Sequence, residues 1–336
     1  MKSNIKALFA AAGITAFAFS PANAYEAGGA GWESKPGVLI GSSAGVPPPG
    51  IYMFNQIFTY QTNLVGPLTN QIGTHTGVQA AVDVQGFLFV PGWTFLGGTY
   101  DAVIVQPFVM ASIGGPLNTS AGFVSQEAGM HNTYFANELS WKLGTSGFVI
   151  KSGLGIYAPD GTIQGPFGLN NVGNPWWTFQ PEVIVSYLKD GWNLTAAVYA
   201  EFNTKNSVDG YTTGDILHAD FTFTKTIGKW TIGPVAYYAG QVSNDSCPAL
   251  SCTVPTGILG NAQRYNLFAV GGLVEYNFGP ASLSVWATQE VLGNAKNAAV
   301  PPAADASTIT QGATVFATLS YQLWAPPAPA TPMIHK

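Results

Sequence analysis

Alternation of apolar and polar side chains is the dominant pattern of this chain, and it is clearest from Thr213 to Val242. Successive side chains on a β-strand point to opposite faces, so the pattern predicts strands with one apolar and one polar face. This stretch contains two such arms, joined by a tight reversal at 227–229. Each arm is about ten residues or more, longer than typical soluble strands and near the length that crosses a bilayer at a tilt.

Similar segments recur along the chain, and the links between them alternate in length. Tight turns are followed by links of eleven residues or more, and only 91–97 is long among the short set. Outer-membrane barrels combine an even number of strands, short periplasmic turns and long external loops. We therefore predict an all-β fold, a transmembrane antiparallel up-and-down β-barrel. Its twelve predicted strands are 51–61, 77–90, 98–112, 131–143, 147–157, 176–188, 192–203, 215–226, 230–243, 263–277, 281–291 and 312–324.

The composition is unusual for a water-soluble domain. Charged residues make up 9% of the chain, against about 25% in ordinary globular domains. After residue 24 there is no apolar run of about eighteen residues, the length that a membrane-spanning helix needs. Lipid outside a barrel, with uncharged polar groups inside, accounts for this balance. The net charge of −5 argues against a nucleic-acid partner, because binding phosphates needs clustered Lys and Arg.

The two ends of the chain differ from the predicted barrel at 51–324. Residues 1–24 have a positive start, an apolar run and a small-x-small site at 22–24, which predicts a cleaved signal peptide and export to the bacterial outer membrane. An uncleaved membrane anchor is the alternative. Residues 25–50 are rich in Gly and Pro and form an irregular N-terminal segment, a candidate plug for the barrel. Residues 325–336 form a Pro-rich tail.

Aromatic and cysteine residues add two expectations. Cys247 and Cys252 lie in one predicted external loop, and in an exported chain we expect a local disulfide, with two free thiols as the alternative. Tryptophans near strand ends are typical of interfacial girdles, and ordinary core packing is the alternative. The tryptophans concerned are Trp93, Trp141, Trp176, Trp177, Trp192, Trp230, Trp286 and Trp324.

The polar strand faces are predicted to line the lumen. An ionisable group that faces hydrocarbon costs about 2–4 kcal/mol for a basic residue at the midplane, and less for an acid. An acid-rich lumen would favour neutral or cationic solutes over anions. The alternative is a structural hydrogen-bond network that fills a narrow barrel. The predicted lumen-lining residues are Asp83, Gln85, Glu182, Glu201, Asn203, His218, Asp220, Gln241 and Glu290.

A second candidate site is the external mouth of the barrel. Four aromatic residues in or beside the long link at 158–175 could contact a planar ligand, and a girdle with a flexible loop is the alternative. These residues are Phe167, Trp176, Trp177 and Phe179.

Catalytic and cofactor chemistry is not indicated. His218 and Asp220 share a strand face, but no nucleophile-elbow sequence accompanies them, and nothing nominates further ligands for a metal. We predict no catalytic residues, no cofactor and no metal. An outer-membrane lipase or esterase stays as a minor alternative.

Several stretches match a known family. They are PPPGIY at 47–52, GIYAPDG at 155–161, GNPWW at 173–177, FQP at 179–181 and the run from Gly210 to Ser246. The chain resembles the outer-membrane family described as "putative MetA-pathway of phenol degradation". The Cys247–Cys252 loop departs from that family, as does Asp160 where Thr is usual. The resemblance implies an outer-membrane barrel, and it supplies no catalytic or binding residues to carry over.

The resemblance also implies a role in moving small hydrophobic or aromatic molecules. We expect passive passage of such solutes, with outer-membrane lipid as the other partner. The alternative is a structural or adhesive barrel that binds a partner through its loops. The pattern leaves the solute and the oligomeric state open.

Overall fold

The computed structural model describes residues 32–65, 77–113, 126–164, 171–208, 210–246, 264–296 and 309–327. Within these ranges no helix is long and apolar enough to cross a membrane. The strands there are β1 (Gly50–Val65), β2 (Gly77–Val90), β3 (Thr94–Phe95), β4 (Gly98–Ile113), β5 (Gln126–Met130), β6 (Tyr134–Lys142), β7 (Phe148–Tyr157), β8 (Thr178–Lys189), β9 (Trp192–Asn203), β10 (Ile216–Ile227), β11 (Trp230–Gln241), β12 (Arg264–Asn277), β13 (Ala281–Lys296) and β14 (Ile309–Trp324).

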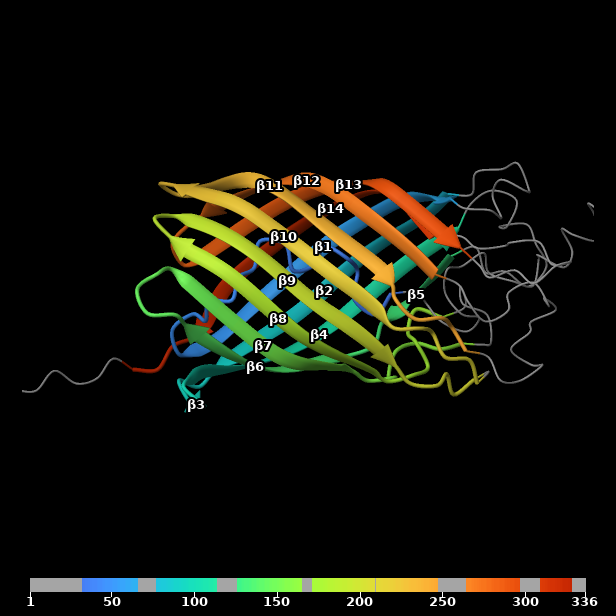
Figure 1. Cartoon of the computed structure of the whole chain (residues 1–336), viewed down its shortest axis with the longest axis horizontal. Coiled ribbons are helices and arrows are strands. Elements are labelled where there is room, and N and C mark those ends of the chain that lie inside the picture. The colour runs from blue at the N-terminus through green and yellow to red at the C-terminus, as the bar shows by residue number, and fades with distance from the viewer. Residues whose placement is uncertain are drawn as a thin grey trace, which may run out of the picture.

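The strands form one closed antiparallel barrel (Figure 1). Neighbours in sequence pair with one another, and β1 pairs with β14 to close the ring. Of the fourteen strands, β3 and β5 are short and pair only with β4, so twelve strands make the wall. The prediction of a twelve-stranded transmembrane barrel is confirmed. Closure leaves no free strand edge, which is what a β-structure in lipid requires.

Most strands present apolar residues to the outside and polar residues to the lumen. In β10, Phe223 is exposed on the outer face, whereas His218 and Asp220 are buried on the inner face. The same division holds in β8, where Val183 points outward and Glu182 points inward. Both strands therefore follow the alternation that the sequence shows.

The wall made by β1, β2 and β4 departs from this division, because apolar residues face the interior there. Val82 of β2 is buried inside, where it packs in one cluster with Phe58 of β1. Its neighbour Asp83 is exposed and lies opposite Ile57 of β1 and Phe108 of β4, which are 52% and 44% exposed. Directly opposed residues share a face, so Asp83 points outward. The barrel therefore has an apolar inner surface on this side.

Two local features differ from the sequence-based expectations. The predicted strand at 131–143 begins three residues later, as β6 at Tyr134, and the predicted link before it contains the short strand β5, which ends at Met130. The gap between β5 and β6 lies beside Pro107, which lacks a backbone donor. Trp176 and Trp286, expected in the girdles, are 3% and 2% exposed. The β13 strand places Trp286 on its inner face, so its position near a chain turn did not decide which side it faces.

Candidate functional site in the barrel lumen

The described part of the N-terminal segment, residues 32–49, runs through the barrel interior. Glu201 lies near the end of β9 that leads to the long link, and Asn193 lies beside the tight turn at the other end. The segment contacts both residues: the N–H of Ser34 donates to Glu201, and Asn193 donates to the carbonyl of Ser42 at 3.3 Å. It therefore spans the lumen. Its backbone N–H groups donate to inward side chains: Ser34 to Glu201 (3.0 Å), Gly37 to Asp220 (2.9 Å), Gly41 to Thr222 (2.9 Å) and Ala44 to Ser186 (2.8 Å).

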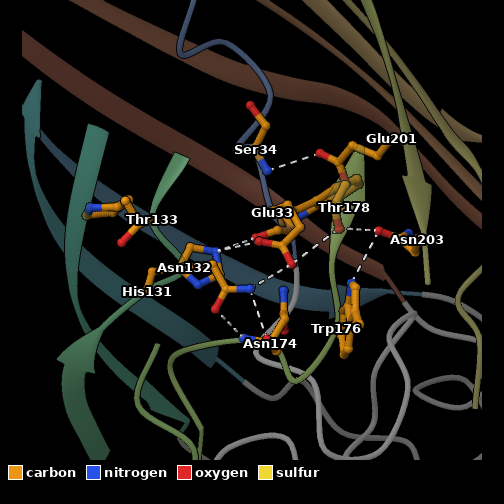
Figure 2. A network of polar contacts seen from close by, with 12 residues as sticks. Glu33, Ser34, His131, Asn132, Thr133, Asn174, Trp176, Thr178, Glu201 and Asn203 are labelled. Atoms are coloured by element: carbon orange, nitrogen blue, oxygen red, sulfur yellow. Dashed lines mark hydrogen bonds and ion pairs between the residues drawn. The ribbon is translucent and has the colours of Figure 1, made fainter. Parts of the chain in front are cut away.

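Glu33 anchors the start of this segment in a buried polar network (Figure 2). Its Oε1 accepts hydrogen bonds from Asn132 at 3.2 Å and Thr178 at 3.4 Å, and His131 Nε2 lies 3.7 Å from its Oε2. Burial, together with the charge of Glu201, raises the pKa of Glu33 well above its ordinary value. Burial also lowers the pKa of His131. The network thus favours neutral forms of both groups.

His218 forms a second buried contact beside this network. Its Nε2 lies 3.1 Å from Glu201 Oε1, and its ring stacks on Tyr199 at 4.6 Å between centroids. The ring of Trp32 meets it edge-on at 5.8 Å. Among the described residues, no group of three or more His, Cys, Asp and Glu side chains could hold a metal ion. His218 therefore sits in a packed polar core that includes the N-terminal segment.

Lys35 ties the segment to β11 and β13. Its ammonium lies 3.3 Å from Glu290 Oε1 on β13 and donates to the Tyr237 hydroxyl at 3.1 Å. The same ammonium lies 4.3 Å from the ring centroid of Tyr60 and 4.8 Å from that of Tyr237. Both charged side chains are at least nine-tenths buried. A charge so placed needs such partners, because its solvation by water has been lost.

A cavity of about 660 Å³ lies between the N-terminal segment and the barrel wall. Its volume falls in the range of small-molecule sites. One side is formed by the apolar inner surface of β1, β2 and β4, with Val82, Val84 and Val105 among the lining residues. The other side carries polar residues of β7 and β8, including Lys151 and Glu182. The interior therefore offers an apolar surface beside a polar one.

Residues 62–300 match the family model described as "Putative MetA-pathway of phenol degradation". The chain belongs to this family. The resemblance drawn from the sequence is thereby confirmed. A search of curated protein sequences found no match.

Three solved structures resemble this chain to different extents. The COG4313 outer membrane channel from Pseudomonas putida F1 is 11% identical, with a TM-score of 0.65 over 86% of this chain and 99% of that one. The beta domain of the Bordetella autotransporter Brka is 13% identical, with a TM-score of 0.43 over 82% of this chain and 100% of that one. The Pseudomonas putida toluene transporter TodX is 11% identical, with a TM-score of 0.36 over 89% and 96%. The similarity to the first structure is one of fold.

Most of the predicted lumen residues lie on inward strand faces. Their part in solute passage stays a prediction, because several are engaged by the N-terminal segment. Asp220, for instance, accepts the N–H groups of Gly37 and Leu39. The inward residues are Glu182, Glu201, Asn203, His218, Asp220, Gln241 and Glu290.

The prediction that Asp83 and Gln85 line the lumen is wrong. Both point outward from β2, where Gln85 donates to Asp83 at 3.0 Å and Asn55 donates to the same oxygen. The alternation in β2 was identified correctly, but its polar face is the outer one. The reason is the apolar cavity, which takes the apolar face of this strand.

Among the residues that the structure describes, the predicted aromatic contact at the mouth is not assembled. Trp176 is buried and its indole N–H donates to Asn203 at 3.2 Å. Trp177 is half exposed, and Phe179 points outward from β8, on the opposite side of the wall from the lumen. Trp176 and Phe179 therefore cannot contact one ligand together.

Other predictions lie outside the described residues. They concern the signal peptide at 1–24, Phe167 at the mouth, and the Cys247–Cys252 disulfide. They stay predictions.

The sequence-based interpretation missed the roles of Glu33 and Lys35. Both lie in a stretch that has no strand pattern, and their partners are far away in the sequence. One signal was available: they are the only charged residues between Glu26 and Asp83. Isolated charges in an apolar, Gly-rich stretch of an exported barrel indicate a segment with specific partners.

Proposed function

We propose that the chain is an outer-membrane channel through which small apolar or aromatic molecules pass down their gradient. The observation that carries this proposal is the apolar-walled cavity inside a transmembrane barrel. A channel for sugars or ions would need a continuous polar path, whereas β1, β2 and β4 present Val, Ala and Phe side chains to the interior. Membership of the family supports the same role.

In this proposal the N-terminal segment acts as a plug that narrows the passage. It lies along the polar inner faces of β8 to β10, where hydrogen bonds to the wall hold it from Ser34 to Ala44. Water and polar solutes therefore find this part of the hydrophilic wall already occupied. Apolar solutes meet the free apolar wall, against which their burial is favourable.

Two other functions are less well supported. A structural or adhesive barrel would not need an apolar cavity of this size. An esterase would need His218 free to activate a serine, yet its ring is packed between Tyr199 and Trp32 and its Nε2 faces Glu201. We assign His218 and Asp220 to holding the N-terminal segment.

A deletion strain complemented with this chain tests the proposal. Uptake of a phenol-sized aromatic should rise with the wild-type chain, and uptake of a sugar of similar size should not. Val84→Asn places an amide on the apolar inner wall and should slow aromatic uptake several-fold. Gln85→Asn, one residue away on the outer face, is the matched control and should behave as wild type. Equal uptake of the aromatic with and without the chain would refute the proposal.

A further inference from the structure

Four charged side chains gather on the inner faces of β4, β6, β7 and β8. Lys151 Nζ lies 3.1 Å from Asp101 Oδ2 and 3.2 Å from Asp101 Oδ1, and it also pairs with Glu138. Glu182 lies on the neighbouring strand, and Gly153 stands between it and Glu138 in register. All four side chains are at least nine-tenths buried in the fold. Two carboxyl groups thus share one ammonium, and a third lies on the next strand.

Glu182 is the carboxyl group of this cluster to which Lys151 donates no hydrogen bond. It is 4% exposed, lines the cavity, and its Oε1 accepts no hydrogen bond from any described residue. The amide oxygen of Gln180, two residues earlier on the same strand face, has no donor either. Leaving buried acceptors unpaired is costly, so such a pair of oxygens points to a ligand that donates hydrogen bonds.

A donor can reach Glu182 from the cavity that this side chain lines. A methyl group at Gly153 would come within 3.2 Å of Glu182 Oε1 and 2.9 Å of Glu138 Cγ, so glycine at this position lets the two carboxyl side chains pack close to each other. The hydrogen bonds of Lys151 are directed to Asp101 and Glu138, so its ammonium donates none to Glu182.

Charge selects among possible donors. The cluster holds three carboxyl groups and one ammonium, and no other cation makes an ion pair with it among the described residues. An ammonium group supplies three N–H donors, no acceptor and a positive charge that would stabilise the ionised form of Glu182. A carboxylate would add like charge and should be excluded. A hydroxyl would donate one hydrogen bond without changing the charge balance.

The apolar part of the cavity then determines the rest of the ligand. Val82, Val84 and Val105 line the same cavity as Glu182. We propose that the lumen contains a binding site for small primary amines with an apolar body, with the ammonium at Glu182 and the body against β2 and β4. This inference rests on the proposed function and names a preferred solute class for that channel.

Three compounds of matched size test the site: 2-phenylethylammonium, 2-phenylethanol and phenylacetate. Their binding to the purified full chain in detergent is measured by isothermal titration at neutral pH, with protein-free micelles as the blank. We expect the ammonium compound to bind at least about tenfold more tightly than the alcohol, because charge-assisted hydrogen bonds are roughly twice as strong as neutral ones. Phenylacetate should bind most weakly.

Two variants locate the effect. Glu182→Gln keeps the shape of the side chain and should reduce the preference for the ammonium compound to within about twofold of the alcohol. Asp83→Asn removes one carboxylate from the outer wall and should keep the full preference. Folding of each variant is checked by far-UV circular dichroism. If Glu182→Gln does not fold, the three wild-type affinities still decide the matter.

The outcomes separate this proposal from the proposed function. Equal affinities of wild type for the amine and the alcohol would overturn the amine site and leave an apolar channel in place. Retention of the amine preference in folded Glu182→Gln would overturn the site as well. Binding of none of the three compounds would overturn both the site and the proposed function.

Discussion

The buried Lys35–Glu290 ion pair gives the sharpest test of how the N-terminal segment is held. Lys35→Met keeps an unbranched apolar stem of similar length and removes the ammonium. Glu290 then loses one partner and retains the hydroxyl of Tyr237 and the backbone N–H of Gly312, both at 2.8 Å. A carboxylate that is 2% exposed is left without its countercharge.

The structure allows the size of this effect to be worked out. Breaking a buried ion pair by removing one partner costs about 3–5 kcal/mol. The loss of the cation–π contacts with Tyr60 and Tyr237 adds to this cost. Since roughly 1.4 kcal/mol corresponds to a tenfold change, the population with a detached segment should rise on the order of 10²–10³-fold. The wall strands do not depend on Lys35 for pairing, so the barrel itself should persist.

Single-channel recording in planar bilayers measures this population. Lys35→Met should open more often and to larger conductance than wild type. Lys225→Met is the matched control, because Lys225 lies on the outer face, with its ammonium 4.8 Å from the ring centroid of Trp192. The double variant Lys35→Met/Glu290→Leu removes both charges and should be less leaky than the single variant.

Two results would refute this reasoning. Wild-type conductance in a folded Lys35→Met protein would mean that the ion pair does not hold the segment. A double variant as leaky as Lys35→Met would mean that the unpaired charge on Glu290 is not what detaches the segment.

Three further predictions concern other parts of the structure. Gly37→Ala should raise conductance, because Gly37 has φ +93° and a Cβ there would lie 2.7 Å from Tyr237 Cδ1. Gly97→Ala is the control and should leave conductance unchanged, because Gly97 has φ +77° but nothing lies within 4 Å of its Cβ position. Equal effects of the two variants on conductance would contradict the contact with Tyr237. Trp286→Ala should lower the free energy of unfolding in urea by about 3–5 kcal/mol, because the ring is fully packed inside, and a loss below about 1 kcal/mol would speak against that packing. Asp83→Asn should leave the cation-to-anion selectivity of any conductance unchanged, and a shifted reversal potential would place this residue in the lumen after all.

The strands and their count were predictable from the sequence, and the reason is local. Alternation at period two is visible residue by residue, and long strands separated by alternating short and long links leave few folds other than a barrel. The predicted strand at 215–226 corresponds to β10 at 216–227, for example. The family was also recognisable, because its matching stretches are contiguous in the chain.

Which face of a strand points inward was predictable only where the interior is polar. Alternation shows that Val82 and Val84 share a face and that Asp83 and Gln85 share the other. It does not determine which face is inside. In β8 to β10 the polar face binds the N-terminal segment, so polar residues point inward. In β2 the inner face borders the apolar cavity, so the same rule gave the wrong answer.

The sequence by itself determined that this chain crosses a membrane as a closed ring of strands, since period and strand length are properties of neighbouring residues. Only the tertiary structure decided where Glu33, Lys35 and Glu182 find or lack partners. Lys35 and Glu290 are 255 positions apart in sequence, and a contact of that range depends on how the whole barrel closes. Burial and countercharge, which control what the lumen can bind, arise only from that closure.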